Sequence, residues 1–201
     1  MSSQKSTAEA RAPKRERGKL RVAALLDAGA AVFVEKGYDA ATMTEIAARA
    51  GAAIGSLYQF FPSKEALADA LLARYCERLV GGLRDIAERA PALGASGVAD
   101  ALVDLMLDLR AERAIGLALV DTMVDAPDRR AMLRGALRGG LADIVRAADP
   151  SLPAARAAAM APMIQQILKA VPALAEEAAE AEARAAIRLY IAHAAQTSSS
   201  T

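Results

Sequence analysis

The chain of 201 residues has one cysteine, one histidine and no tryptophan, and only 3% of its residues are aromatic. The single cysteine, Cys76, cannot form an intramolecular disulfide, and no N-terminal apolar stretch precedes a small-residue cleavage site, so secretion is not indicated. The longest run without a charged residue, Ala50 to Ser63, has 14 residues and is too short to cross a bilayer. We therefore expect a cytoplasmic protein that does not enter a membrane.

Groups that carry out catalysis are equally scarce. The lone histidine, His193, lies near the C-terminal end, and Cys76 has no second nucleophile or base close to it in the sequence. No metal-ligand cluster, glycine-rich phosphate loop or nucleophile elbow occurs. We expect no enzyme activity, no catalytic residue, no metal and no cofactor. A redox-sensing role for Cys76 is an alternative, although buried structural thiols are commoner.

Alanine is abundant instead, with 52 residues. Alanine loses least on entering a helix, and apolar residues recur at helical spacing between glycines and prolines, so we expect an all-α fold. An all-β sandwich or barrel is excluded by the same composition. The expected helices span about residues 17–36, 42–51, 53–60, 63–89, 98–113, 114–124, 131–148, 154–171 and 180–195.

Charge is distributed unevenly along the chain. Residues 1–64 hold 10 Lys+Arg and 6 Asp+Glu, or +4, and residues 65–201 hold 15 and 18, or −3, which together give the net charge of +1. A basic segment joined to a mildly acidic one suggests that only the first meets a polyanion, although chance imbalance is the alternative. The expected organisation is a disordered basic arm (1–16), a helix-turn-helix domain (17–62), a helical domain (63–196) and a disordered tail (197–201).

A segment in the N-terminal third has the signals of a helix-turn-helix. Thr42 and Glu45 form the pattern Thr-x-x-Glu ahead of apolar residues, which predicts a capping box at a helix start. Gly51 permits a tight turn, and the small Ala47 four residues before it permits close approach of the neighbouring helix. The helix expected at 53–60 then projects outward, and such a helix enters the major groove of DNA. A purely structural three-helix bundle is the alternative.

Several short motifs follow one another at fixed spacing in this segment. They are Gly37-Tyr38, Thr42-Met43, Glu45-Ile46-Ala47, Ala50-Gly51 and the run from Gly55 to Leu67. This pattern resembles that of the DNA-binding domain of the tetracycline-repressor (TetR) family, and the resemblance covers about residues 17–67. It implies a transcriptional regulator that binds double-stranded DNA, in which an N-terminal helix-turn-helix precedes a larger helical domain for ligand binding and dimerisation.

Residue types divide the expected DNA contacts into two groups. A helix start favours phosphate, so Thr42 and Lys64 are expected to contact the DNA backbone. The resemblance adds Tyr58 to this group, with a plain core tyrosine as the alternative. Among the base readers, Gln59 is the one side chain suited to bidentate contact with adenine. The expected base readers are Ala53, Ile54, Ser56 and Gln59, with Gly55 allowing the backbone to approach.

Ala53 departs from the pattern of the family, because similar proteins often place Ser or Thr at this helix start. A side-chain cap worth about 1 kcal/mol is therefore expected to be missing. We expect nearby basic residues to compensate by reaching a minor groove, and DNA binding to depend strongly on salt. These basic residues are Lys14, Arg15, Arg17 and Lys19.

The larger domain is expected to hold a small-molecule effector, because the resemblance implies an apolar ligand cavity there. Core packing is the alternative for each lining residue, since methionine is a common filler of core gaps. We expect a hydrophobic or amphipathic effector. The candidate lining residues are Tyr75, Leu105, Met106, Leu109, Leu117 and Met123.

Two apolar stripes near the end of the chain predict an isologous homodimer built as a four-helix interface, as in the family. Two DNA-reading heads would then meet half-sites about 34 Å apart on a near-palindromic operator. The first stripe is Met160, Met163, Ile164, Ile167, Leu168 and Val171, and the second is Ile187, Tyr190, Ile191 and Ala194.

These features together predict a ligand-responsive transcriptional repressor that its effector releases from DNA. The alternative is a helical adaptor that binds a protein partner and has little affinity for DNA, which the uncapped Ala53 and the modest +4 charge would fit.

Overall fold

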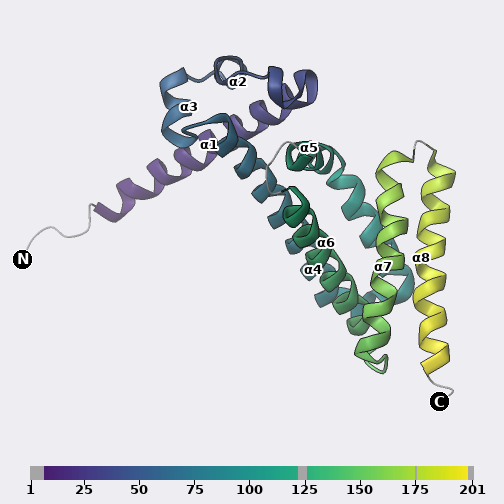
Figure 1. Ribbon diagram of the computed structural model, residues 1–201. Coiled ribbons are helices and arrows are strands. Elements are labelled where there is room, and N and C mark those ends of the chain that lie inside the picture. The colour runs from purple at the N-terminus through teal and green to yellow at the C-terminus, as the bar shows by residue number, and fades with distance from the viewer. Residues whose placement is uncertain (1–6, 122–125, 175, 199–201) are drawn as a thin grey trace, which may run out of the picture. The chain divides into compact units, whose positions relative to one another are not determined.

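The computed structural model describes the backbone of residues 7–121, 126–174 and 176–198, and the side chains within 16–120, 127–174 and 176–193. Over these ranges the regular structure is helical (Figure 1), which confirms the all-α prediction. The elements are α1 (Thr7–Ala40), α2 (Met43–Arg49), α3 (Ile54–Phe60), α4 (Lys64–Asp108), α5 (Arg110–Asp121), α6 (Ala126–Ala148), α7 (Ala154–Ala170), the 3-10 turn η1 (Val171–Ala173) and α8 (Glu177–Ser198).

The chain forms two compact units. The first unit combines Met1–Ala73 with Ile115–Thr122, and the second combines Arg74–Ala114 with Met123–Thr201. The whole segment expected to form the helix-turn-helix therefore falls in the first unit.

Helix α1 begins at Thr7, ten residues before the expected start at Arg17. The expected disordered arm is thus helical over residues 7–16, because the alanine, glutamate and arginine residues there favour helix. Residues 1–6 of the arm lie outside the described residues. The regular helix is interrupted at Gly37, whose φ of 78° lies in the left-handed region, so the expected helix stop is confirmed.

Helix α4 corrects the expectation of separate helices around Pro91. The helix continues from Lys64 to Asp108 and is kinked at Gly94, where φ is 62°. A positive φ costs glycine little, so the chain bends there and resumes helical geometry without an intervening loop. At the other end of the chain, α8 extends to Ser198 and includes two residues of the expected disordered tail, whereas residues 199–201 lie outside the described part.

Helix α4 is also the one described helix that is long and apolar enough, by length and composition alone, to cross a membrane. Its most apolar window has a mean hydropathy of 1.4 and is 33% buried within the protein. Several of its side chains are core residues, including Val98 and Leu102, which are completely buried. Core helices of soluble proteins also meet this length and composition test, so the feature is weak evidence for a membrane span.

The core of the first unit forms where α1, α2, α3 and the start of α4 meet. Leu25 of α1, Ile46 of α2, Leu57 of α3 and Leu67 of α4 are completely buried. Gly29 allows α1 to approach α4 closely, because a Cβ placed there would lie 2.9 Å from Leu67 Cδ2. Through these buried side chains the short helices α2 and α3 pack against α1 and the start of α4.

The second unit is a helical bundle in which α6 packs on α7 and α7 runs beside α8 (Figure 1). Polar contacts also connect helices of this unit. Arg138 Nε of α6 donates to Gln165 Oε1 of α7 over 2.7 Å. Arg184 Nη2 of α8 donates to Asp104 Oδ1 of α4 over 2.6 Å. The largest fully buried side chains of this unit are Leu102, Leu109, Leu141, Ile144, Met160, Ile164 and Leu168.

Two adjacent glycines of α6 give a stability prediction with a built-in control. A Cβ at Gly140 would lie 2.8 Å from Leu83 Cδ1 and 3.1 Å from Leu83 Cβ, whereas a Cβ at Gly139 would meet nothing within 4 Å. Both alanine variants gain about 1 kcal/mol of helix propensity. We therefore expect Gly139→Ala to be stabilising and Gly140→Ala to be about 1–3 kcal/mol less stable than Gly139→Ala, by urea unfolding. Equal stabilities would contradict the close approach of α6 and α4.

Candidate nucleic-acid interface

Helix α2 starts with the expected capping box. The amide of Glu45 donates to Thr42 Oγ1 over 3.3 Å, and the amide of Thr42 donates to Glu45 Oε2 over 3.2 Å. The Thr42 hydroxyl also donates to Glu45 Oε2 over 3.0 Å. Each residue thus satisfies a backbone donor of the other, which fixes the first turn of α2.

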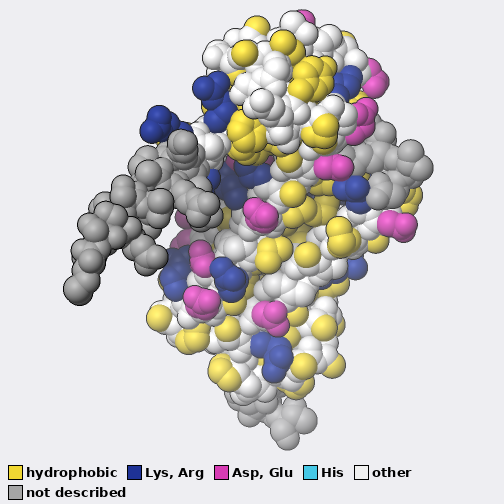
Figure 2. Space-filling model, turned by 90° about the vertical axis from the view of Figure 1, so that its left-hand side faces the viewer, with side chains coloured by type: hydrophobic (Ala, Val, Ile, Leu, Met, Phe, Trp, Pro, Cys, Tyr) yellow, Lys and Arg dark blue, Asp and Glu magenta, His cyan; other side chains and the backbone are white. Residues whose placement is uncertain are grey.

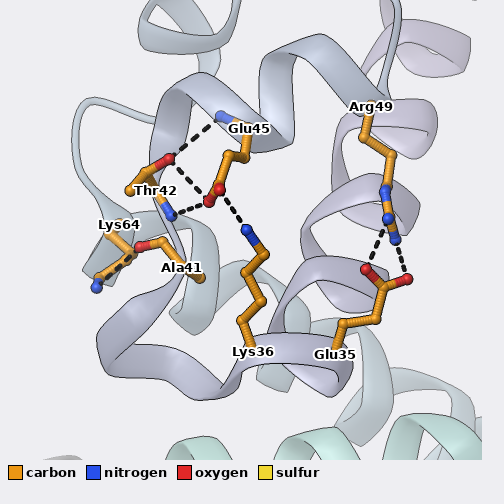
Figure 3. A network of polar contacts seen from close by, with 7 residues as sticks. All are labelled: Glu35, Lys36, Ala41, Thr42, Glu45, Arg49 and Lys64. Carbon is orange, nitrogen blue, oxygen red and sulfur yellow. Dashed lines mark hydrogen bonds and ion pairs between the residues drawn. The ribbon is translucent and has the colours of Figure 1, made fainter.

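Two ion pairs hold α2 against α1 (Figure 3). Lys36 Nζ pairs with Glu45 Oε1, and Arg49 forms a two-pronged contact with Glu35, in which Nη2 and Oε2 are 2.6 Å apart. The Lys36 ammonium, followed by the Thr42 hydroxyl, lowers the pKa of Glu45 below its ordinary 4.5. The Arg49 guanidinium likewise lowers the pKa of Glu35. Lys36 and Arg49 therefore form ion pairs within the first unit, between α1 and α2.

These lowered pKa values predict how stability depends on pH. A carboxylate with a lower pKa in the folded state than in the unfolded state stabilises the fold above the unfolded value, and this contribution disappears as pH falls through the folded value. We expect the melting temperature of the first unit to fall below pH 4.5. The double variant Glu35→Gln with Glu45→Gln should show a shallower fall, by circular dichroism at a series of pH values. If the melting temperatures of the wild type and the double variant fell in parallel as pH is lowered, these two carboxylates would not contribute to the pH dependence of stability.

The turn between α2 and α3 also follows its predicted geometry. Gly51 has a φ of 59°, and the amide of Ala52 donates to the carbonyl of Ala47 over 2.9 Å. Ala47 is buried, so its small side chain lies at the contact between the two helices. The left-handed glycine and the small buried residue therefore set the turn.

Helix α3 is anchored by one side chain. Leu57 is the single buried residue of its seven, and Ala53 caps the helix without any side-chain hydrogen bond, as expected. The other side chains of α3 are exposed or, for Ser56, partly exposed. The tyrosine at position 58 is 49% exposed, which excludes the alternative of a core tyrosine. The exposed candidates of this region are Thr42, Ala53, Ile54, Gly55, Tyr58 and Gln59.

Helix α3 presents a neutral surface. Its sequence contains no charged residue, and two of its apolar side chains, Ile54 and Phe60, are each 40% exposed. On the face drawn in Figure 2, lysine and arginine side chains lie in separate groups among acidic and apolar ones. The exposure of Phe60 is a feature that sequence periodicity did not single out as functional.

Lys64 lies at the first position of α4 and already has partners. Its Nζ donates to the carbonyl oxygens of Tyr38, Asp39 and Ala41 over 2.8, 3.1 and 3.2 Å. The sequence predicted its place at a helix start but gave no sign of these carbonyl partners, which lie at least 23 residues away in the chain.

The sequence of this segment matches that of a known family. Residues 25–71 match the model of the bacterial regulatory proteins of the tetR family. The transcriptional activator FasR of Mycolicibacterium smegmatis is 44% identical over 94 residues, which cover 42% of this chain and 43% of FasR. The transcriptional repressor KstR2 of Rhodococcus jostii is 44% identical over 62 residues, or 31% of this chain and 30% of KstR2.

Residues 25–71 of the chain belong to the TetR family. The matches of the chain span less than half the length of these curated relatives. Both relatives are named as transcriptional regulators, which agrees with the expectation that the chain is not an enzyme.

Solved TetR structures share the fold over most of the chain. A TetR-family transcriptional regulator from Streptomyces coelicolor is 27% identical, with a TM-score of 0.53 over 87% of this chain and 99% of that one. PfmR from Thermus thermophilus, also of the TetR family, is 22% identical, with a TM-score of 0.63 over 83% and 96%. The likeness to PfmR concerns the fold alone.

The residues expected to line an effector cavity differ in how deeply they are buried. Leu105 is partly buried, and Leu117 is 38% exposed and belongs to the first unit, so the expectation that it lies in a bundle interior is wrong. Met123 lies outside the described residues. The buried candidates, all in the second unit, are Tyr75, Met106 and Leu109.

The two stripes expected at a TetR dimer interface are mostly buried inside this chain. Six of their side chains are at most 4% exposed, so they are core residues of the second unit and unavailable to a partner. The prediction that these six form the interface is therefore wrong, because the apolar spacing identified the inward face of α7 and α8. The six are Met160, Ile164, Leu168, Val171, Ile187 and Ile191.

The remaining stripe residues lie nearer the surface. Met163 is 54% exposed, while Ile167 and Tyr190 are partly exposed. Leu189, which the sequence analysis did not select, is 63% exposed. The side chain of Ala194 lies outside the described residues. Apolar side chains of α7 and α8 thus remain at the surface, although most of the expected stripe residues are buried.

Cys76 is partly buried in α4. Burial raises the pKa of its thiol above the ordinary 9.0, so little thiolate forms near neutral pH. Because the thiolate is the reactive form, this environment does not favour the redox-sensing alternative.

Proposed function

We propose that this chain is a ligand-responsive transcriptional repressor of the cytoplasm, which binds a near-palindromic operator as a homodimer and is released by a small hydrophobic effector. The observation that carries the proposal is the outward face of α3, which is held by Leu57 alone and leaves its other side chains exposed or partly exposed. A short exposed helix that follows a helix-turn-helix turn fits the major groove of DNA.

The contacts are divided by residue chemistry. Tyr58 has an exposed phenol that can donate to a phosphate, and Gln59 can form two hydrogen bonds with adenine. Ile54 can meet the methyl group of thymine, and Ala53, Gly55 and Ser56 let the backbone come close. Thr42 is exposed at the start of α2, but a phosphate there would have to take over the hydroxyl hydrogen that Glu45 now accepts.

Salt dependence is part of the proposal. Residues near the start of α1 supply positive charge, and Lys19 is well exposed with Glu16 3.8 Å away. Such phosphate contacts release counterions, so affinity should fall steeply as salt rises. Lys14 and Arg15 have side chains outside the described residues, and their backbone is helical. Arg17 and Lys19 belong to the same helix, so the basic residues are on a helix and not on an extended arm.

The dimer and the effector site rest on apolar surface. We place the dimer contact on the outward face of α7 and α8, where Met163, Ile167, Leu189 and Tyr190 are exposed or partly exposed, because exposed apolar patches of this kind mark interaction sites. We place the effector in the second unit beside Tyr75, whose burial raises the pKa of its phenol and keeps it neutral. An apolar effector suits these surroundings.

The test is a fluorescence-anisotropy titration at stated salt against the DNA that flanks the gene of this protein. We expect a sequence-preferring complex. Tyr58→Phe should weaken binding to all duplexes alike, whereas Gln59→Ala should change which duplexes are preferred. If no duplex is preferred over random DNA, the alternative of a protein-binding adaptor replaces the proposal.

A further inference from the structure

Lys64 uses all of its hydrogen-bonding capacity inside the protein. An ammonium group has three N–H donors, and here they meet three carbonyl oxygens, those of Tyr38, Asp39 and Ala41, within 3.2 Å. The same ammonium lies 4.5 Å from the centre of the Tyr38 ring, within range of a cation–π interaction. A phosphate could gain an N–H from Lys64 only if one of these carbonyls lost it.

The three carbonyls lie just where α1 needs a positive charge. The regular helix is broken at Gly37, and the last turn of α1 has no basic residue of its own. Carbonyl groups at a helix end lack intrahelical donors and carry partial negative charge. Lys64 supplies both the donors and the charge from a different helix.

The same three bonds fix the point where α2 begins. Ala41 is buried and directly precedes Thr42, the residue that caps α2. Figure 3 shows Lys64 on the opposite side of this connector from the Lys36–Glu45 pair. The connector between α1 and α2 is therefore bound to α4 through Lys64, while Lys36 of α1 pairs with Glu45 in the first turn of α2.

We propose that Lys64 is a positioning residue for DNA recognition, which sets the α1–α2 connector and thereby the placement of α2 and α3, and that it does not hold a phosphate. This inference rests on the proposed function, since it concerns how the head is presented to DNA. It replaces the phosphate role that its position at a helix start suggested.

Salt dependence separates the two roles. The full chain and its Lys64→Met variant are titrated with a duplex selected by the wild-type protein, over a range of salt, at a temperature where circular dichroism shows both fully folded. We expect Lys64→Met to bind about tenfold more weakly at every salt concentration, with parallel plots of log K against log salt. A phosphate role predicts instead that the slope shrinks by about 0.9 for each lost contact, or about 1.8 for two heads.

Two further variants control the comparison. Lys169→Met removes an exposed lysine in the last turn of α7 and should change neither affinity nor slope. Lys64→Arg keeps the charge but replaces a compact ammonium by a planar fork, so it should also weaken binding, whereas a phosphate contact would survive in it. If the methionine variant does not fold, the arginine variant still distinguishes the two roles.

Hydrogen exchange on the DNA-free chain gives a second measurement. We expect faster exchange of the amides at residues 41–49 in Lys64→Met than in the wild type, with those of α7 unchanged. A reduced slope, an unchanged affinity in the folded variant, or unchanged exchange would each overturn the inference. If the wild type prefers no duplex, the proposed function fails, and the exchange experiment still decides whether Lys64 fixes the connector.

Discussion

Replacing Ile164 by aspartate is expected to unfold the second unit. Ile164 of α7 is completely buried, and the described neighbours of this inward face are apolar core residues such as Met160 and Leu168. Burying an unpaired carboxylate and losing the isoleucine together cost on the order of 5 kcal/mol, a large part of the stability of a typical domain. Thermal melting by circular dichroism would show a melting temperature at or below room temperature.

The adjacent residue provides the control. Met163→Asp changes a side chain that is 54% exposed, so the variant should keep the helical content and nearly the melting temperature of the wild type. On the proposed dimer face the same change should shift the protein toward monomer in analytical ultracentrifugation. If Ile164→Asp stayed folded while Met163→Asp unfolded, the assignment of inward and outward faces of α7 would be reversed.

The second large effect is expected at Leu57, the single buried side chain of α3. Leu57→Ala removes the apolar anchor of a seven-residue helix that has no side-chain cap, at a cost of about 2–5 kcal/mol. DNA binding should fall by more than about 100-fold, because α3 loses its fixed orientation in the groove. Urea unfolding and anisotropy titration measure the two quantities.

Ile54→Ala is the matched change on the outer face of the same helix. Ile54 is 40% exposed, so the free energy of unfolding should change by less than about 0.5 kcal/mol. DNA affinity should fall modestly, and the fall should be confined to duplexes that carry particular thymines. Equal destabilisation by Leu57→Ala and Ile54→Ala would mean that α3 is packed in another orientation.

The sequence predicted the helix-turn-helix well because its signals are local. The capping box of Thr42 and Glu45 involves residues three positions apart, and Gly37 and Gly51 act through their own backbone torsions. Such features need no knowledge of distant neighbours. The uncapped start of α3 at Ala53 was predictable for the same reason.

The faces of the C-terminal helices could not be assigned in this way. Periodicity shows that Met160, Ile164 and Leu168 share one side of α7, but it does not say whether that side meets the same chain or a second copy. In this fold α6 and α8 pack on α7, so the apolar side is already covered. Knowing which helices are neighbours requires the tertiary arrangement.

Polar contacts between residues far apart in the chain could not be predicted from the sequence either. Arg49 and Glu35 are 14 positions apart, and Lys64 is 26 positions from Tyr38. No spacing rule joins residues at these separations. A basic residue near a DNA-reading helix therefore suggests a phosphate ligand from sequence alone, although the protein itself supplies the acceptors.

Lys64 attaches the first turn of α4 to the end of α1, which limits how far that turn can move alone. Its three hydrogen bonds measure 2.8–3.2 Å. Lengthening them by about half an ångström takes the longest beyond the range of such a bond. If the proposed effector displaces this turn, the turn must either carry the end of α1 along with it or detach from it, and sub-ångström motion suffices for detachment.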